Sequence, residues 1–327
     1  MTSASPARVV AGRSADRPTL DDLYAETSRL ELTPGWIDRP DPVFWPQPKT
    51  AFQPMSWRYE QLRQALDVAG ELIDVTLSER RNLVLRNPIA GNNFGTTRTL
   101  VNAYQMLLPG ELAPSHRHSA HAFRLILDAR DSYSVVDGVR VPMNSGDVVL
   151  TPGGKWHGHG HEGDEPAYWL DGLDVPLVHL VEPMFYQPHP DTFQPVTEIA
   201  TDTPYRFAAQ DIERALDQAQ PGPDGVHGPR ITLPTPEMPT MGLTIERLAA
   251  GSGTRPHRST ANRIFTVVSG SGWTIVDDKH FPWTRGDTVV APSWSRFSHH
   301  ASTDATLFSV SDEPTMRALN YYRSEDL

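Results

Sequence analysis

The segments PGELAPSHRH (residues 109–118) and GDVVLTPGGKWH (residues 146–157) decide how this chain folds. With their spacing they read G-x5-H-x-H and G-x5-P-x-G-x2-H. Side chains two apart on a β-strand point to the same side, so His116 and His118 can bind one ion together. His157 follows a Gly-Asp turn and a Pro-Gly turn, and it can add a third imidazole from a neighbouring strand. Three histidines leave positions open on the ion, as reactive metal sites require.

Composition sets the broad class of the protein. The 327 residues, 38% of them hydrophobic, are enough for two domains with packed cores. The net charge of -11 opposes binding to nucleic acid and to anionic membranes. The absence of cysteine excludes disulfides, thiolate metal sites and cysteine nucleophiles. The sequence shows no signal-peptide core and no run of about 18 apolar residues, so we expect a cytoplasmic protein.

Short β-rich runs separated by Gly, Pro and Asp fill two parts of the chain and predict two β-sandwiches or barrels. The run YWLDGLDVPLV (residues 168–178) closes the first part. Helical spacing of apolar residues predicts helices near residues 20–30, 57–73, 211–218 and 314–322. We expect four regions: an N-terminal arm with helices (1–78), a first barrel (79–190), a linker with a short helix (191–235), and a second barrel with a C-terminal helix (236–327).

The two β-rich parts form an internal repeat with an offset of about 140 residues. The second copy keeps the glycine-to-histidine spacing at His257, but Ser259 and Phe297 stand where the first copy has its second and third histidines. We therefore expect a degenerate second barrel without a metal ion. Its interior is predicted to be filled by aromatic side chains, namely Phe265, Trp273, Trp283 and Phe297.

The first barrel lacks a carboxylate ligand. Ala122, Phe123 and Arg124 follow its H-x-H pair, so three imidazoles leave a divalent ion with its full charge. Such an ion attracts a bidentate, anionic substrate. Neutral nitrogen donors suit Fe(II), Mn, Ni, Cu or Zn, and the ligand types alone do not choose among them.

The two motifs are similar to the signature motifs of cupin barrels. Nearly the whole chain resembles the bicupin gentisate 1,2-dioxygenase family, which includes salicylate and 1-hydroxy-2-naphthoate dioxygenases. The matching segments occur in the same order: WPQPKTAFQPMSWRYEQLRQAL, SERRNLVLRNP, PGELAPSHRHSAHAFR, GDVVLTPGGKWHGHG, YWLDGLDVPLV and SDEPTMRAL. The resemblance implies an all-β fold of two jelly-roll barrels (double-stranded β-helices) with an N-terminal helical or extended arm. It also implies one Fe(II) per subunit in the N-terminal cupin, O2 as co-substrate, and a homotetramer.

The resemblance also implies roles for particular residues. The iron ligands are His116, His118 and His157. Arg124 meets the substrate carboxylate and forms a catalytic set with His159 and Asp171. The residues implied to bind substrate are Arg80, Arg124, Gln105 and His159.

Spacing supports some of these roles and leaves others open. Arg124 lies at even spacing from the metal-binding histidines, so on one continuous strand it faces the barrel interior. A buried arginine needs an anion, which is either the substrate carboxylate or a carboxylate of Asp171 or Glu111. Arg80 and Arg81 are adjacent, so at most one of them lines the pocket.

Together with these features, the resemblance implies an Fe(II)-dependent dioxygenase. It inserts both atoms of O2 into an ortho-hydroxybenzoate and cleaves the ring between the carboxyl- and hydroxyl-bearing carbons, while His159 moves protons or orients its neighbours. Gentisate, salicylate, substituted salicylates and hydroxynaphthoates are all candidates, because Ser119–Phe123 and Gly153–Trp156 depart from the family next to the pocket. Two alternatives are a non-catalytic bicupin that binds a metal and an aromatic acid, and another cupin enzyme such as a Mn or Zn isomerase.

Overall fold

The structure, a computed structural model, describes residues 19–36, 38, 42–74, 80–222 and 226–327, and it divides into two units, residues 1–48 and 49–327. The first unit contains α1 (Leu20–Arg29), which begins with a capping box between Thr19 and Asp22. Beyond this helix Trp36 stacks on Tyr24, with ring centroids 6.1 Å apart. Residues 1–18 of the predicted arm lie outside the described residues.

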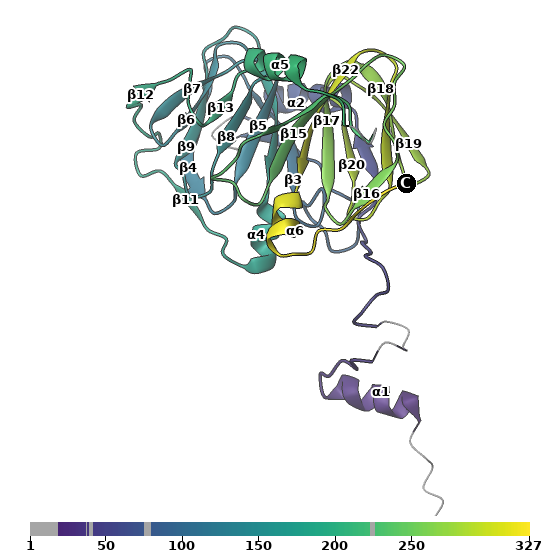
Figure 1. The fold of residues 1–327 in the computed structure, drawn as a ribbon. Coiled ribbons are helices and arrows are strands. Elements are labelled where there is room, and N and C mark those ends of the chain that lie inside the picture. The colour runs from purple at the N-terminus through teal and green to yellow at the C-terminus, as the bar shows by residue number, and fades with distance from the viewer. Residues whose placement is uncertain (1–18, 37, 39–41, 75–79, 223–225) are drawn as a thin grey trace, which may run out of the picture. The chain divides into compact units, whose positions relative to one another are not determined.

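The second unit consists of two β-barrels that lie side by side, which confirms the predicted all-β bicupin fold (Figure 1). Each barrel has an inner sheet, which faces the other barrel, and an outer sheet. The inner sheet of the N-terminal barrel has the order β13 (Arg206–Phe207), β8 (Val148–Thr151), β5 (Ala122–Asp128), β10 (Ala167–Leu173), β3 (Val101–Leu107) and β2 (Arg81–Val84). Its outer sheet has the order β11 (Tyr186–Pro188), β4 (Leu112–His118), β9 (His157–His161), β6 (Ser132–Val136), β7 (Val139–Met143) and β12 (Glu198–Ile199).

The C-terminal barrel repeats this arrangement. Its inner sheet has the order β1 (Met55–Trp57), β20 (Thr288–Ala291), β17 (Arg263–Ser269), β22 (Ala305–Ser311), β15 (Gly242–Leu248) and β14 (Arg230–Leu233). Its outer sheet has the order β19 (Lys279–Thr284), β18 (Ser271–Val276), β21 (Phe297–Ala301), β16 (His257–Ser259) and β23 (Ser324–Asp326). Within the described residues, the helices of this unit are α2 (Tyr59–Leu72), α4 (Val175–Val181), α5 (Ala209–Gln218) and α6 (Glu313–Ala318).

The main hydrophobic core lies between the two inner sheets. Side chains along β3 alternate, so that Met106 packs in this core while Gln105 and Leu107 point into the N-terminal barrel. On β15, Ile245 joins the same core while Leu248 packs inside the C-terminal barrel. The inner strands are therefore buried on both faces, as the burial of nearly every residue of β3, β5 and β22 shows.

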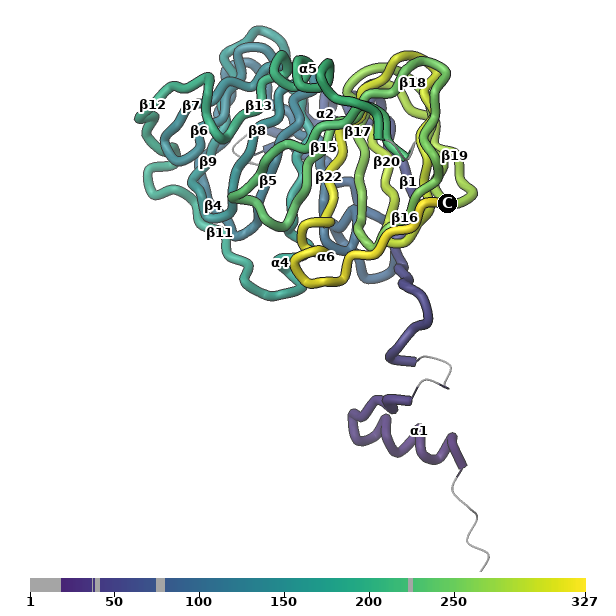
Figure 2. The backbone as a smooth tube through the Cα atoms, viewed as in Figure 1, coloured from purple at the N-terminus to yellow at the C-terminus, as the bar shows by residue number. Residues whose placement is uncertain are grey.

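Segments outside the two β-rich regions complete the sheets. β1 belongs to the predicted N-terminal arm, yet it pairs with β20 of the C-terminal barrel, and the tube in Figure 2 follows this early segment to the late barrel. The predicted linker, residues 191–235, supplies β12 and β13 to the N-terminal barrel and β14 to the C-terminal barrel. Strand pairing thus joins the predicted regions to one another.

Strand register supports the internal repeat. Asp171 lies opposite Ala103 in the first barrel, and Ser309 lies opposite Thr244 at the matching place in the second. The second barrel contains the expected aromatic core of Phe265, Trp283 and Phe297.

Two local predictions were wrong. Trp273 lies outside the barrel core, 36% exposed, because its neighbours Gly272 and Thr274 take the inward positions on β18. The run YWLDGLDVPLV is not one strand. β10 ends at Leu173 and α4 follows, with Pro176 at its start, where the missing backbone N–H of proline costs nothing.

Candidate metal centre

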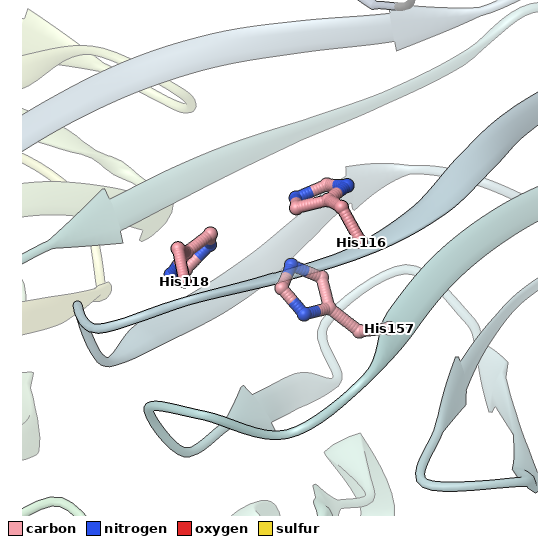
Figure 3. Close-up of side chains that lie close together, drawn as sticks. All are labelled: His116, His118 and His157. Atoms are coloured by element: carbon pink, nitrogen blue, oxygen red, sulfur yellow. The ribbon is translucent and has the colours of Figure 1, made fainter. Parts of the chain in front are cut away.

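Three histidine side chains converge inside the N-terminal barrel (Figure 3). His116 and His118 lie on β4, and His157 lies opposite His116 on the adjacent strand β9. The ring centroid of His157 is 4.3 Å from that of His116 and 4.8 Å from that of His118. One ring nitrogen from each residue lies within 4.8 Å of the other two. The structure thus brings together the three residues that the motifs predict as ligands.

Backbone carbonyls orient all three rings. In each case Nδ1 donates a hydrogen bond to the carbonyl oxygen of a residue two positions away: His116 to Pro114 at 3.3 Å, His118 to Ala120 at 2.8 Å and His157 to Lys155 at 3.1 Å. Because a carbonyl only accepts, each Nδ1 carries the proton and each Nε2 keeps a lone pair for an ion. The Nε2 atom of His157 is buried and has no partner among the described residues, so the set fits a metal ion.

Burial keeps these histidines neutral, which is the form that binds metals. Desolvation, followed by the charge of Arg80, lowers the pKa of His116 to about 2 and the pKa of His118 to about 4. Burial lowers the pKa of His157 well below its usual value as well. A proton therefore does not compete for these sites near neutral pH.

The two adjacent arginines Arg80 and Arg81 have different neighbours. Arg80 lines the cavity at the metal centre, and one of its guanidinium nitrogens lies 2.5 Å from Nε2 of His116. Arg81 is 4% exposed and forms a bidentate ion pair with Glu111, at 2.5 and 2.6 Å. This arrangement agrees with the expectation that only one of them faces the pocket, and it leaves Glu111 unavailable to Arg124.

Arg124 and Asp171 form a buried ion pair beside the metal centre. Nε of Arg124 lies 3.1 Å from a carboxylate oxygen of Asp171, and NH1 donates to Oγ1 of Thr151 at 2.7 Å. The premise that Arg124 shares a strand with the histidines was wrong, because the turn at Ser119–His121 separates β4 from β5, and these strands lie in different sheets. Arg124 still lines the cavity. Burial raises the pKa of Asp171, and the charge of Arg124 opposes that rise.

Gln105 and His159 are also buried. Gln105 lines the cavity, and its Nε2 has no hydrogen-bond partner among the described residues. Nδ1 of His159 lies 2.8 Å from the hydroxyl of Ser134, while its Nε2 is likewise unpartnered in the described part of the chain. His159 is 3% exposed and does not line the cavity, so it can act only on groups at the centre of the barrel.

The cavity has a volume of about 360 Å³, which suits a small molecule. Its polar end contains the histidines and arginines, and its remaining wall is largely apolar: Val84, Phe94, Val101, Ala103, Leu173 and Val175. Tyr186 also lines the cavity and stacks on His116, with ring centroids 5.1 Å apart. The sequence analysis missed Tyr186, Phe94 and Thr151, since no motif marks the first two and Thr151 carries no ligand spacing of its own.

We expect substitutions at the two adjacent arginines to separate binding from stability. Arg80→Met should raise KM for an aromatic carboxylate with little effect on unfolding, because Arg80 lines the cavity. Arg81→Met should lower the free energy of unfolding by about 1.5–3 kcal/mol, because it leaves Glu111 without its ion pair. Steady-state kinetics and urea unfolding of both variants check this. Equal effects of the two variants on KM would contradict the assignment.

Comparison with known proteins agrees with this geometry. A cupin domain model matches residues 103–174. A gentisate 1,2-dioxygenase from Aquipseudomonas alcaligenes is 33% identical, with 92% of this chain and 95% of that protein covered. A 5-aminosalicylate 1,2-dioxygenase from a Comamonas species is 32% identical over 94% of this chain and 90% of that protein. The crystal structure of a salicylate 1,2-dioxygenase from Pseudoaminobacter salicylatoxidans with gentisate superposes with a TM-score of 0.84 at 29% identity, covering 97% and 96% of the two chains.

The fold and the site define a bicupin ring-cleaving dioxygenase with a three-histidine metal-binding site in its N-terminal barrel. Within the described residues, no helix is long and apolar enough to cross a membrane. The chain belongs to the gentisate 1,2-dioxygenase family, together with the salicylate and 1-hydroxy-2-naphthoate dioxygenases.

Proposed function

We propose that this protein is an Fe(II)-dependent dioxygenase that cleaves an ortho-hydroxybenzoate between its carboxyl- and hydroxyl-bearing carbons. The observation that carries the proposal is a cluster of three neutral histidines, two of which, His116 and His118, line the polar end of a cavity that Arg80 and Arg124 also line. His116, His118 and His157 would hold Fe(II), which would supply the activation of O2 and would attract the anionic substrate. The relatives named above, which are a gentisate and a 5-aminosalicylate dioxygenase, support the choice of an aromatic acid as substrate.

The residues of the pocket bind and orient the substrate. The guanidinium of Arg80, next to the histidines, attracts the carboxylate. Arg124 has five N–H donors. One of them donates to Thr151, and Nε lies 3.1 Å from Asp171 without a hydrogen bond, so donors remain available to the same carboxylate. Gln105 offers its unpartnered amide to a polar group on the ring. The apolar wall contacts the ring itself and excludes water.

We assign proton transfer to His159. Ser134 holds its Nδ1 at 2.8 Å and thereby fixes the orientation of the ring. The buried Nε2 is then directed to the interior, where it donates or accepts a proton at an oxygen of the substrate. Asp171 keeps Arg124 in place and balances its charge when no substrate is present.

The reaction is tested with metal-free protein that is reloaded anaerobically with Fe(II). A panel of gentisate, salicylate, 5-aminosalicylate and 1-hydroxy-2-naphthoate is added, and O2 uptake is followed together with the ultraviolet absorbance of ring-opened product. At least one acid should consume one O2 per ring opened, and with ¹⁸O2 the product should gain both labelled atoms. Benzoate, which lacks the hydroxyl, is the control. O2 uptake absent with every acid contradicts the proposal, and an isomeric product formed without O2 favours the isomerase alternative.

The same proposal includes a cytoplasmic homotetramer, which rests on family membership. Light scattering coupled to size-exclusion chromatography measures the assembly directly. A mass close to four times 36.4 kDa is expected. A monomer mass at working concentration contradicts this part of the proposal alone.

A further inference from the structure

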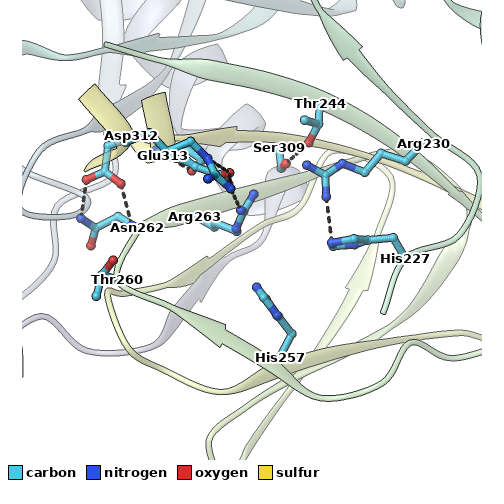
Figure 4. Close-up of polar contacts among 12 residues, drawn as sticks. His227, Arg230, Thr244, His257, Thr260, Asn262, Arg263, Ser309, Asp312 and Glu313 are labelled. Carbon is cyan, nitrogen blue, oxygen red and sulfur yellow. Dashed lines mark hydrogen bonds and ion pairs between the residues drawn. The ribbon is translucent and has the colours of Figure 1, made fainter. Parts of the chain in front are cut away.

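The interior of the C-terminal barrel carries a cluster of charged and polar side chains (Figure 4). Arg230, Glu246 and Arg263 lie on its inner sheet, and His257 and Ser259 on its outer sheet. Arg230 lies opposite Glu246 in strand register, on the face of β15 that points into the barrel. The expectation of an interior filled by aromatic residues therefore describes only part of this barrel.

The repeat places this cluster at the end of the barrel that holds the metal centre in the first copy. Arg230 lies opposite Glu246 as Asn82, which lines the first cavity, lies opposite Gln105. His257 and Ser259 occupy the positions of the first two metal ligands. The polar cluster of the second barrel thus lies at the position of the metal centre in the first barrel, but the residues at the metal-ligand positions differ.

Arg230 is a half-buried cation that forms no ion pair with a carboxylate of the described residues. No carboxylate of the described residues forms an ion pair with it, and its one hydrogen-bond acceptor there is Nε2 of His227, at 2.8 Å. Glu246 is engaged elsewhere, since it accepts from the backbone N–H of Gly228 at 2.6 Å and lies 3.5 Å from His227. A guanidinium has five donors, so most of those on Arg230 have no acceptor among the described residues. Burial and the charge of Arg263 lower the pKa of Arg230, while the charges of Glu246 and Glu313 oppose that shift.

Two further donors in the cluster are buried and unsatisfied. Nε of Arg263 and Oγ of Ser259 have no hydrogen-bond partner among the described residues, although the side chains are only 4% and 2% exposed. Glu313 pairs with the other end of Arg263 and also with Arg317, so it does not neutralise the cluster by itself. In Figure 4 the side chains of Arg230, Arg263 and His257 point toward one another. Unpartnered donors that face one region suit an anion with several acceptor atoms.

The side chains deeper in the same barrel are apolar. Phe297 replaces the third metal ligand, and Phe265 replaces Arg124, because it pairs with Ser309 as Arg124 pairs with Asp171. The two rings lie 5.1 Å apart and belong to the hydrophobic core of this barrel. A ligand that fits both parts has a carboxylate at one end and an apolar body at the other.

We propose that the C-terminal barrel is a second, metal-free binding site for a small monocarboxylate with an apolar body. Arg230 binds the carboxylate, assisted by the free donors of Arg263 and Ser259. Phe265 and Phe297 contact the apolar body. This site is separate from the metal centre and does not depend on the proposed reaction.

The test uses the metal-loaded, full-length protein and 4-fluorobenzoate as the probe, followed by ¹⁹F NMR. A bound resonance is expected that persists in Arg80→Met and weakens at least about tenfold in Arg230→Met, the loss expected for one charge-assisted hydrogen bond. Arg296→Met, at a half-exposed arginine of the same barrel, is the control and should keep the resonance. Arg230→Met should also leave the activity at the metal centre unchanged.

Other outcomes decide against the proposal. It is overturned if every bound resonance survives Arg230→Met, or if none survives Arg80→Met, since the probe then binds only in the first barrel. If inorganic phosphate displaces the probe as readily as benzoate does, the site does not recognise an apolar body, and that part of the proposal is wrong. If thermal unfolding shows that Arg230→Met does not fold, Ser259→Ala replaces it, and unchanged probe affinity in that variant overturns the proposal.

Discussion

Replacing His118 by alanine is expected to remove the metal ion from the protein and to abolish turnover. The side chain is one of three whose ring nitrogens lie within 4.8 Å of one another, and two imidazoles hold a divalent ion poorly. Removing a residue that only hydrogen-bonds to a metal ligand lowers metal affinity or activity by about 10–100-fold. Removing a ligand itself should therefore have a larger effect. Metal content by mass spectrometry and O2 uptake measure the two effects.

His280→Ala is the matched control for this experiment. His280 is exposed on β19 of the C-terminal barrel, and the substitution removes the same imidazole from the chain. Its metal content and turnover should equal those of the unmodified protein. A His118→Ala protein that keeps one ion per chain and full activity would remove the metal assignment.

The second large effect is expected at Arg124. Arg124→Met leaves the buried carboxylate of Asp171 without its cation, which should lower the free energy of unfolding by about 3–5 kcal/mol. The double variant Arg124→Met with Asp171→Asn should recover part of that loss, because the uncompensated charge is gone. Urea unfolding of both variants gives the two free energies, and Arg130→Met, at an arginine with 93% side-chain exposure, is the control.

The same pair separates stability from function. The double variant should keep only a small part of the turnover even where its stability recovers, since Arg80 alone of the two arginines that line the cavity is then left to hold the substrate carboxylate. If the double variant is no more stable than Arg124→Met alone, the ion pair does not account for the burial of Asp171. Full turnover in the double variant would show that Arg80 alone binds the substrate carboxylate.

The sequence predicted the metal centre well because its determinants are local. A two-residue step on a strand and fixed glycine and proline turns place His116, His118 and His157 with little dependence on the rest of the chain. The relation of the two barrels was also visible, since the repeat carries the same turn spacing in both. These are features that a short stretch of backbone can specify by itself.

Long-range pairing was not visible in the same way. The strand β1 is only three residues long, and nothing in its composition says that its partner lies in the other barrel. The neighbours of Arg124 depend on how β5, β8 and β10 pair in one sheet. The sequence therefore could not tell whether the anion that pairs with Arg124 is the substrate carboxylate or Asp171. The polar cluster of the C-terminal barrel was missed because Arg230 lies in a segment that composition marked as a linker.

The pairing of β1 with β20 also constrains how the protein is made. During translation Met55–Trp57 emerge early, but the strand that they pair with does not exist until Val290 has left the ribosome. The early segment therefore stays unpaired while the N-terminal barrel is synthesised, and its sheet can close only once β20 has been made. A nascent chain arrested before β20 exposes this strand, so the inner sheet of the C-terminal barrel depends on segments made far apart in time.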